Sequence, residues 1–91
     1  MVVGVDEQVL EGAELSVYPN PVSDRFTVSL SNSELRMNRI DVFDLNGRKV
    51  LSFDNLKTKS FTVSRKNLDA GIYLVKITTA SGVAVKKITL Q

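Results

Sequence analysis

Hydrophobic and polar residues alternate along most of this chain with a period of two, which is typical of β-strands that bury one face. Phe26, Val28 and Leu30 alternate with polar residues, and Phe61 and Val63 do so further along. No segment has a sustained helical period, and turn-forming residues separate the apolar runs. The pattern predicts seven short strands, at residues 14–18, 25–30, 39–44, 48–53, 59–64, 72–79 and 83–90.

Two dipeptides mark the hairpins. Asn46-Gly47 favours a type I′ turn, in which both residues have positive φ, and Ser81-Gly82 is a weaker signal before the last strand. Asp44-Leu-Asn46-Gly47 lacks the spaced acids and the closing Glu of a calcium loop, so we interpret it as a turn. Seven strands with frequent turns in about 80 residues predict an all-β, seven-stranded antiparallel sandwich.

The apolar positions of the last predicted strand change face in its middle. Val83 and Val85 are odd-numbered, whereas Ile88 and Leu90 are even-numbered. We expect either a β-bulge at Lys86-Lys87 or a strand that crosses from one neighbour to another. Either arrangement turns at least one of the two lysines outward.

The chain contains no Cys and no His. Without Cys there is no disulfide, no Cys-based zinc site and no Cys nucleophile. Without His the commonest general base and metal ligand is missing, and an enzyme would depend on carboxylates, Lys, Tyr or Ser. We therefore expect a non-catalytic module with no metal, no cofactor and no small-molecule substrate.

Charge is distributed unevenly along the sequence. Residues 1–56 carry five Lys or Arg and nine Asp or Glu, net −4, whereas residues 57–91 carry seven and one, net +6. A solvated surface explains this asymmetry, and so does a basic patch that attracts an acidic partner. Nucleic-acid binding is not expected, because aromatic residues are not interleaved with the basic ones.

Residues 1–13 contain two glycines and three acids with little periodicity, so we interpret them as a linker before a domain at residues 14–91. No apolar run approaches the roughly 18 residues of a membrane span, and the start lacks the basic region of a signal peptide. An export signal would lie elsewhere, in a longer protein of which this chain is a piece.

Pro19-Asn20-Pro21 follows the first predicted strand. Neither proline has an N–H for a sheet ladder, and Pro21 keeps Asn20 extended. A rigid break between two strands explains the motif, and a docking role stays open.

Three segments, in order, resemble a known family. They are Leu15–Asp24 with Pro19-Asn20-Pro21, Ile40–Val50 with Asn46-Gly47-Arg48, and Leu68–Ile77 with Gly71-Ile-Tyr73, followed by Lys86-Lys87-Ile88. This set resembles the type A C-terminal sorting domain of proteins secreted by the type IX (Por) secretion system of Bacteroidota. The resemblance covers residues 14–91 and implies a seven-stranded, immunoglobulin-like sandwich.

The resemblance also implies a route of export. Such proteins reach the periplasm by an ordinary signal peptide, cross an outer-membrane translocon, and end at the cell surface or outside the cell. A surface sortase usually cleaves upstream of the domain, which would place cleavage within residues 1–13. The domain is then the substrate of an enzyme, and its expected partners are the translocon and the sortase.

Site residues follow from the resemblance by position. The implied recognition element for the translocon consists of Gly71, Tyr73, Val75, Lys76, Lys86, Lys87 and Ile88. Pro19, Asn20 and Pro21 would mark the start of the folded domain.

Two functions of other classes stay open. An immunoglobulin-like adhesion or carbohydrate-binding module would expose aromatic rings for stacking, for which Tyr18, Phe43, Phe53 and Tyr73 are available. A structural or dimerisation domain would self-associate weakly through an exposed strand edge.

Overall fold

A computed structural model describes residues 14–31 and 34–91. The described residues form seven strands: β1 (Glu14–Tyr18), β2 (Arg25–Ser31), β3 (Met37–Asp44), β4 (Lys49–Phe53), β5 (Ser60–Ser64), β6 (Gly71–Thr79) and β7 (Gly82–Leu90). Each strand lies where the alternation of apolar residues predicts one. No helix is found in the described part of the chain, and thus none that is long and apolar enough to span a membrane.

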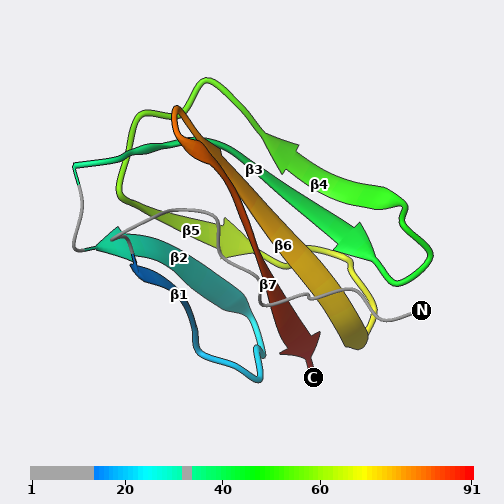
Figure 1. Cartoon of the computed structure of the whole chain (residues 1–91). Helices are drawn as coiled ribbons and strands as arrows, with labels where there is room; N and C mark the ends of the chain where they lie inside the picture. Colours follow the sequence, from blue (N-terminus) through cyan, green and yellow to red (C-terminus); the bar gives the residue numbers. More distant parts are fainter. Residues whose placement is uncertain (1–13, 32–33) are drawn as a thin grey trace.

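The strands form two antiparallel sheets that pack face to face (Figure 1). One sheet has the order β1-β2-β5, and the other has the order β4-β3-β6-β7. This arrangement confirms the predicted seven-stranded all-β sandwich. β1 and β7 each have a single strand partner and are therefore edge strands.

The core lies between the sheets and is built from alternate residues of each strand. Phe26 and Val28 project from β2, and they face Ile40, Val75 and Ile77 from the other sheet, all five fully buried. The neighbouring positions on β2 and β6 are polar, partly exposed or exposed, as the period of two requires. The same alternation explains why the strands could be located from sequence.

The prediction of a type I′ turn in the β3–β4 hairpin is wrong. Among the described residues Gly47 has positive φ, at 85°, but Asn46 does not. The Asp44 carboxylate instead accepts hydrogen bonds from the backbone N–H groups of Asn46 and Arg48, at 3.0 and 2.9 Å. This Asx-type capping favours a turn with only one left-handed residue, because hydrogen bonds to the Asp44 side chain hold the turn together without a positive φ at Asn46. The hydrogen bond from Arg48 lowers the pKa of Asp44, and desolvation opposes it only in part.

Candidate recognition site around the last strand

β7 pairs with β6 along its whole length, from Gly82 opposite Thr79 to Leu90 opposite Gly71. The register is continuous, so both predicted alternatives, a bulge at the lysine pair and a crossing strand, are wrong. Ala84, Ile88 and Leu90 lie on the buried face, and Val83 and Val85 lie on the partly exposed outer face. The change of face inferred from the apolar positions was wrong because valines also occupy outer positions of strands, where their shape fits the pleated surface.

The three apolar members of the implied recognition element are core residues. Tyr73, Val75 and Ile88 are at most 7% exposed. The Tyr73 hydroxyl donates a hydrogen bond to the Asp69 carbonyl at 2.8 Å, which ties the start of β6 to the loop before it. This contact resembles the tyrosine corner of immunoglobulin-type sandwiches. In the folded domain these side chains hold β6 and β7 against the core, and a partner cannot contact them directly.

Replacing Tyr73 with Phe removes this hydrogen bond and leaves the Asp69 carbonyl without its partner. We expect the free energy of unfolding to fall by about 1 kcal/mol, measured by denaturant titration. Tyr18→Phe is the matched control, because the Tyr18 side chain is half exposed and its loss should change stability by less than about 0.5 kcal/mol. Equal effects of the two substitutions would contradict the structural role of Tyr73.

Gly71 opens β6 with φ of 150°, a conformation that side chains rarely adopt. A Cβ added at this position would meet no atom within 4 Å. The glycine is therefore required by the backbone conformation and not by the close approach of a neighbour.

The candidate lysines lie on opposite faces of the hairpin. Lys76 and Lys87 are on the outer face, because Lys76 pairs with Val85 and Lys87 pairs with Leu74 in an unbroken register. Lys86 is on the opposite face of β7, toward the sheet that contains β1. Lys87 is exposed, as predicted for at least one of the pair. A partner that contacts both residues of the Lys86-Lys87 pair must therefore wrap around the edge of β7.

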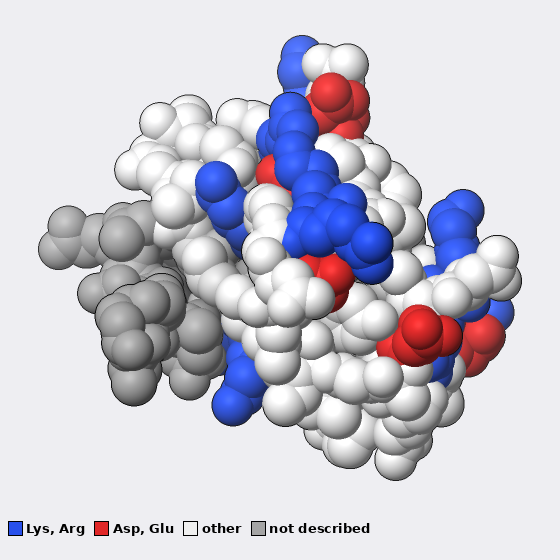
Figure 2. All heavy atoms as spheres, turned by 90° about the vertical axis from the view of Figure 1, so that its right-hand side faces the viewer, with Lys and Arg blue, Asp and Glu red and all other residues white. Residues whose placement is uncertain are grey.

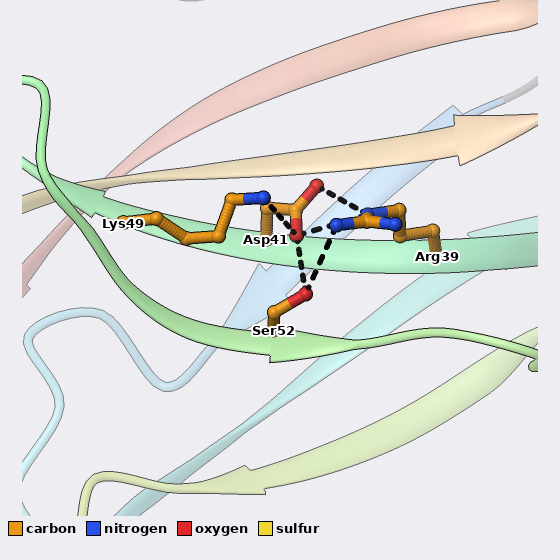
Figure 3. Close-up of polar contacts among 4 residues, drawn as sticks. All are labelled: Arg39, Asp41, Lys49 and Ser52. Carbon is orange, nitrogen blue, oxygen red and sulfur yellow. Dashed lines mark hydrogen bonds and ion pairs between the residues drawn. The ribbon is translucent and has the colours of Figure 1, made fainter.

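A polar cluster that the sequence analysis did not identify lies on the outer face of the same sheet (Figure 3). The Asp41 side chain is only 5% exposed. It accepts hydrogen bonds from Arg39 Nε at 2.9 Å and Ser52 Oγ at 2.7 Å, and Lys49 Nζ lies 3.7 Å away. Desolvation raises the pKa of Asp41, but the hydrogen bonds from Ser52 and Arg39 and both nearby positive charges outweigh it and hold this pKa below its ordinary value of 3.8.

This cluster predicts a contribution to stability that depends on pH. A carboxyl whose pKa is lowered by folding stabilises the protein above its unfolded pKa, and the contribution is lost as pH falls through the folded pKa. We expect wild type to be more stable than Asp41→Asn at pH 7 and this difference to shrink below about pH 4. Denaturant titration of both proteins at pH 7 and pH 3 measures it. A difference that is constant with pH would show that the carboxylate charge is irrelevant.

The Pro-Asn-Pro loop covers the end of β7. The backbone N–H of Thr89 donates to Asn20 Oδ1 at 3.0 Å, and Asn20 Nδ2 donates to the Lys87 carbonyl at 3.4 Å. Val22 then pairs with Leu90 as a short parallel bridge, donating to the Thr89 carbonyl and accepting from the Gln91 N–H, both at 2.8 Å. The Pro-Asn-Pro loop and the last strand, which are far apart in sequence, thus form one unit.

Arg65 fixes the same end of β7 from the β5–β6 loop. Its guanidinium donates to the carbonyls of Ser23 at 2.8 Å and Leu68 at 2.9 Å, and also to the carbonyl of Gln91. Arg65 was not among the predicted site residues, because nothing in its local sequence distinguishes it from other loop cations.

The free edges of β1 and β7 border a groove of about 520 Å³. Its lining consists of Leu15, Ser16, Val17 and Tyr18 from β1, with Asn20, Lys86 and Lys87. The lining therefore combines apolar side chains, a half-exposed tyrosine and the Lys86-Lys87 pair. No group of three or more acids, Cys or His that could hold a metal ion occurs among residues 14–31 and 34–91.

Lys and Arg side chains gather in a row on the side of the molecule that Figure 2 shows, with some Asp and Glu side chains against this row and others apart from it. Asp41 has the one described carboxylate on the outer face of the strands of the larger sheet. The same face has four cations: Arg39, Lys49, Lys76 and Lys87. The strand surface around β7 is therefore positively charged on its outer face and in the groove.

Comparison with known proteins shows the family of this chain. The model of the family described as "Secretion system C-terminal sorting domain" matches residues 16–91. An ulvan lyase (NLR42) of Nonlabens ulvanivorans is 32% identical over 76 residues, and an endo-acting ulvan lyase of Formosa agariphila is 26% identical over 76 residues. Each match covers 84% of this chain but only 14% of the relative, so the chain spans about one seventh of those proteins. The chain belongs to the family of secretion-system C-terminal sorting domains, the signal domains of type IX secretion.

Proposed function

We propose that the folded sandwich presents the surfaces on both sides of β7 to the outer-membrane translocon of the type IX system. The observation that carries this proposal is the convergence of the Pro-Asn-Pro loop, Arg65 and the β6–β7 hairpin on a single strand. A strand fixed from three sides has one shape, and a receptor loses little conformational entropy when it binds a surface that is already ordered.

The residues that a receptor could touch are the lysines. Lys87 is exposed, and Lys76 and Lys86 are partly exposed, whereas Tyr73, Val75 and Ile88 are buried. We therefore divide the implied recognition element into contact residues, which are Lys76, Lys86 and Lys87, and residues that hold β6 and β7 in place. Positive charge at the contact residues would attract an acidic receptor surface and align it.

Export in this proposal runs through the periplasm, and a surface sortase then cleaves within residues 1–13. That segment lies outside the described residues. The proposed cargo is the remainder of a longer protein, since the ulvan lyases match only over a small part of their length. The domain itself is proposed to be non-catalytic, which is supported by a sequence with no His and no Cys.

The carbohydrate-binding alternative receives no support from the described surface. Tyr18 is the one aromatic residue among the large hydrophobic side chains that are exposed in residues 14–31 and 34–91. A stacking platform for sugars needs more than one such ring on a face.

A reporter assay tests the proposed function. Residues 1–91 are fused behind a signal peptide and a fluorescent protein that folds in the periplasm, and the fusion is expressed in a bacterium with a type IX system. We expect the reporter outside the cell in the parent strain and in the periplasm of a strain without the translocon. Delivery that is equal in both strains would refute the proposal.

A further inference from the structure

Half of the β7 edge has no strand partner among the described residues, and half is covered. The covered half begins at the carbonyl of Lys87 and is held by Asn20 and Val22, which bond to that carbonyl and to backbone groups of Thr89 and Gln91. All of these outward groups belong to odd-numbered residues. Because the register with β6 is unbroken, Val83 and Val85 direct their N–H and C=O groups to the same open edge.

The open half reaches the groove between β1 and β7 at Lys86 and Lys87. Lys86 lines this groove together with Leu15 and Val17, and none of the seven lining residues is acidic. The site thus offers a row of backbone hydrogen-bonding groups, apolar lining residues, and Lys86 on the groove side of β7. These are the elements by which a sheet edge accepts an added strand from another chain.

A second copy of the domain is a poor occupant of this edge. Pairing β7 with β7 would place Lys86 and Lys87 of two copies close together, and lysines on an edge strand oppose such pairing. An extended segment with carboxylates at alternate positions avoids this repulsion and supplies charge opposite Lys86.

We propose that the open half of β7, from Val83 to the N–H of Lys87, together with the β1–β7 groove, accepts an extended acidic segment of a partner protein as an added strand. This inference deepens the proposed function and rests on it for the assignment of that segment to the export machinery. It names the edge of β7 as the contact, whereas the proposed function requires only that the translocon bind the surfaces on both sides of β7.

Peptide titration tests the groove by itself. The probe is a capped hexapeptide of alternating Glu and Thr, added to the isotope-labelled 91-residue chain while backbone amide shifts are recorded. We expect saturable shifts at the amides of Val83, Val85 and Lys87. The same peptide with N-methyl groups on alternate amides, or with Lys in place of Glu, should not produce them.

Two variants separate the backbone and the charge contributions. Val85→Pro removes one outward N–H without removing a bond to β6, and prolines are tolerated on the open side of edge strands. It should abolish the saturable shifts, and Val85→Thr, which keeps the N–H, should preserve them. Lys86→Glu should weaken binding at least about tenfold, with Lys57→Glu in the β4–β5 loop as the control. The N-methylated probe on the wild-type chain keeps the test valid if Val85→Pro does not fold.

Several outcomes would overturn the inference. These are the absence of saturable shifts, shifts confined to the face around Arg39 and Lys49, or shifts at the β7 amides that depend on protein concentration without peptide, which would indicate a second copy. In the reporter assay, normal export of a folded Val85→Pro variant would overturn the strand-addition contact but leave the proposed function standing. Loss of translocon dependence for the wild-type fusion would refute the proposed function even if the peptide bound.

Discussion

Leu90→Ala should lower the free energy of unfolding by about 2–5 kcal/mol, the cost of a large cavity in a packed core. Leu90 is the last residue of β7 and is 2% exposed. Its backbone pairs with Gly71 on one side and with Val22 on the other. The side chain therefore stabilises the junction between the segment around Val22 and the last strand.

Thermal unfolding followed by circular dichroism measures this effect. A domain of this size loses roughly 4–8 °C of melting temperature per kcal/mol, so a decrease of about 8 °C or more is expected. Thr89→Ala is the matched control, since the neighbouring Thr89 side chain is exposed and should change the melting temperature little. A Leu90→Ala variant that melts like wild type would show that the end of β7 is dispensable for the fold.

Truncation of β7 would remove core residues as well as surface residues. Ala84, Ile88 and Leu90 all belong to the core, so deletion of residues 82–91 removes a central part of the fold together with any signal on its surface. Loss of export after such a deletion would not distinguish recognition from folding. Surface substitutions that leave the core intact are needed for that purpose.

Asn20→Ala should destabilise the domain by about 1–2 kcal/mol, because two hydrogen bonds to the β7 backbone are lost. The longer of these bonds is donated by Asn20 Nδ2 to the Lys87 carbonyl, and the shorter one is accepted by Asn20 Oδ1 from the Thr89 N–H. Asn20→Asp keeps the acceptor and should therefore cost less than Asn20→Ala.

Hydrogen exchange locates the effect of Asn20→Ala. The Thr89 amide should lose protection, whereas the amides of β3 should change only as far as global stability changes. Uniform loss of protection with no excess at Thr89 would contradict the view that Asn20 acts as a local clamp on β7.

The strands could be located from sequence because each is encoded locally. Phe26, Val28 and Leu30 alternate with polar residues over a stretch that one strand spans, and the structure buries all three. The same local rule failed at Val83 and Val85, where apolar residues occupy the outer face. It also failed at Asn46, because the conformation of that residue depends on the Asp44 side chain two residues earlier.

The candidate site was less accessible to sequence reasoning because its contacts are long-range. Asn20 meets Lys87 and Thr89 at separations of 67 and 69 residues, and Arg65 reaches back to Ser23 across 42 residues. The alternation of apolar and polar residues along the chain does not reveal contacts between residues so far apart in sequence. The family resemblance assigned the site residues by their position in sequence, but only the structure shows that Tyr73 and Ile88 are buried while Lys87 is exposed.

The central claim is that a folded domain presents charged surfaces on both sides of β7 to the export machinery. The most direct measurement is export of the periplasmic reporter carrying Lys86→Glu with Lys87→Glu, compared with Lys57→Glu with Lys66→Glu, which changes the charge equally on two loops. All variants are first shown by thermal unfolding to be folded. We predict that the β7 variant stays in the periplasm and the loop variant reaches the outside of the cell. Equal export of both would contradict the claim.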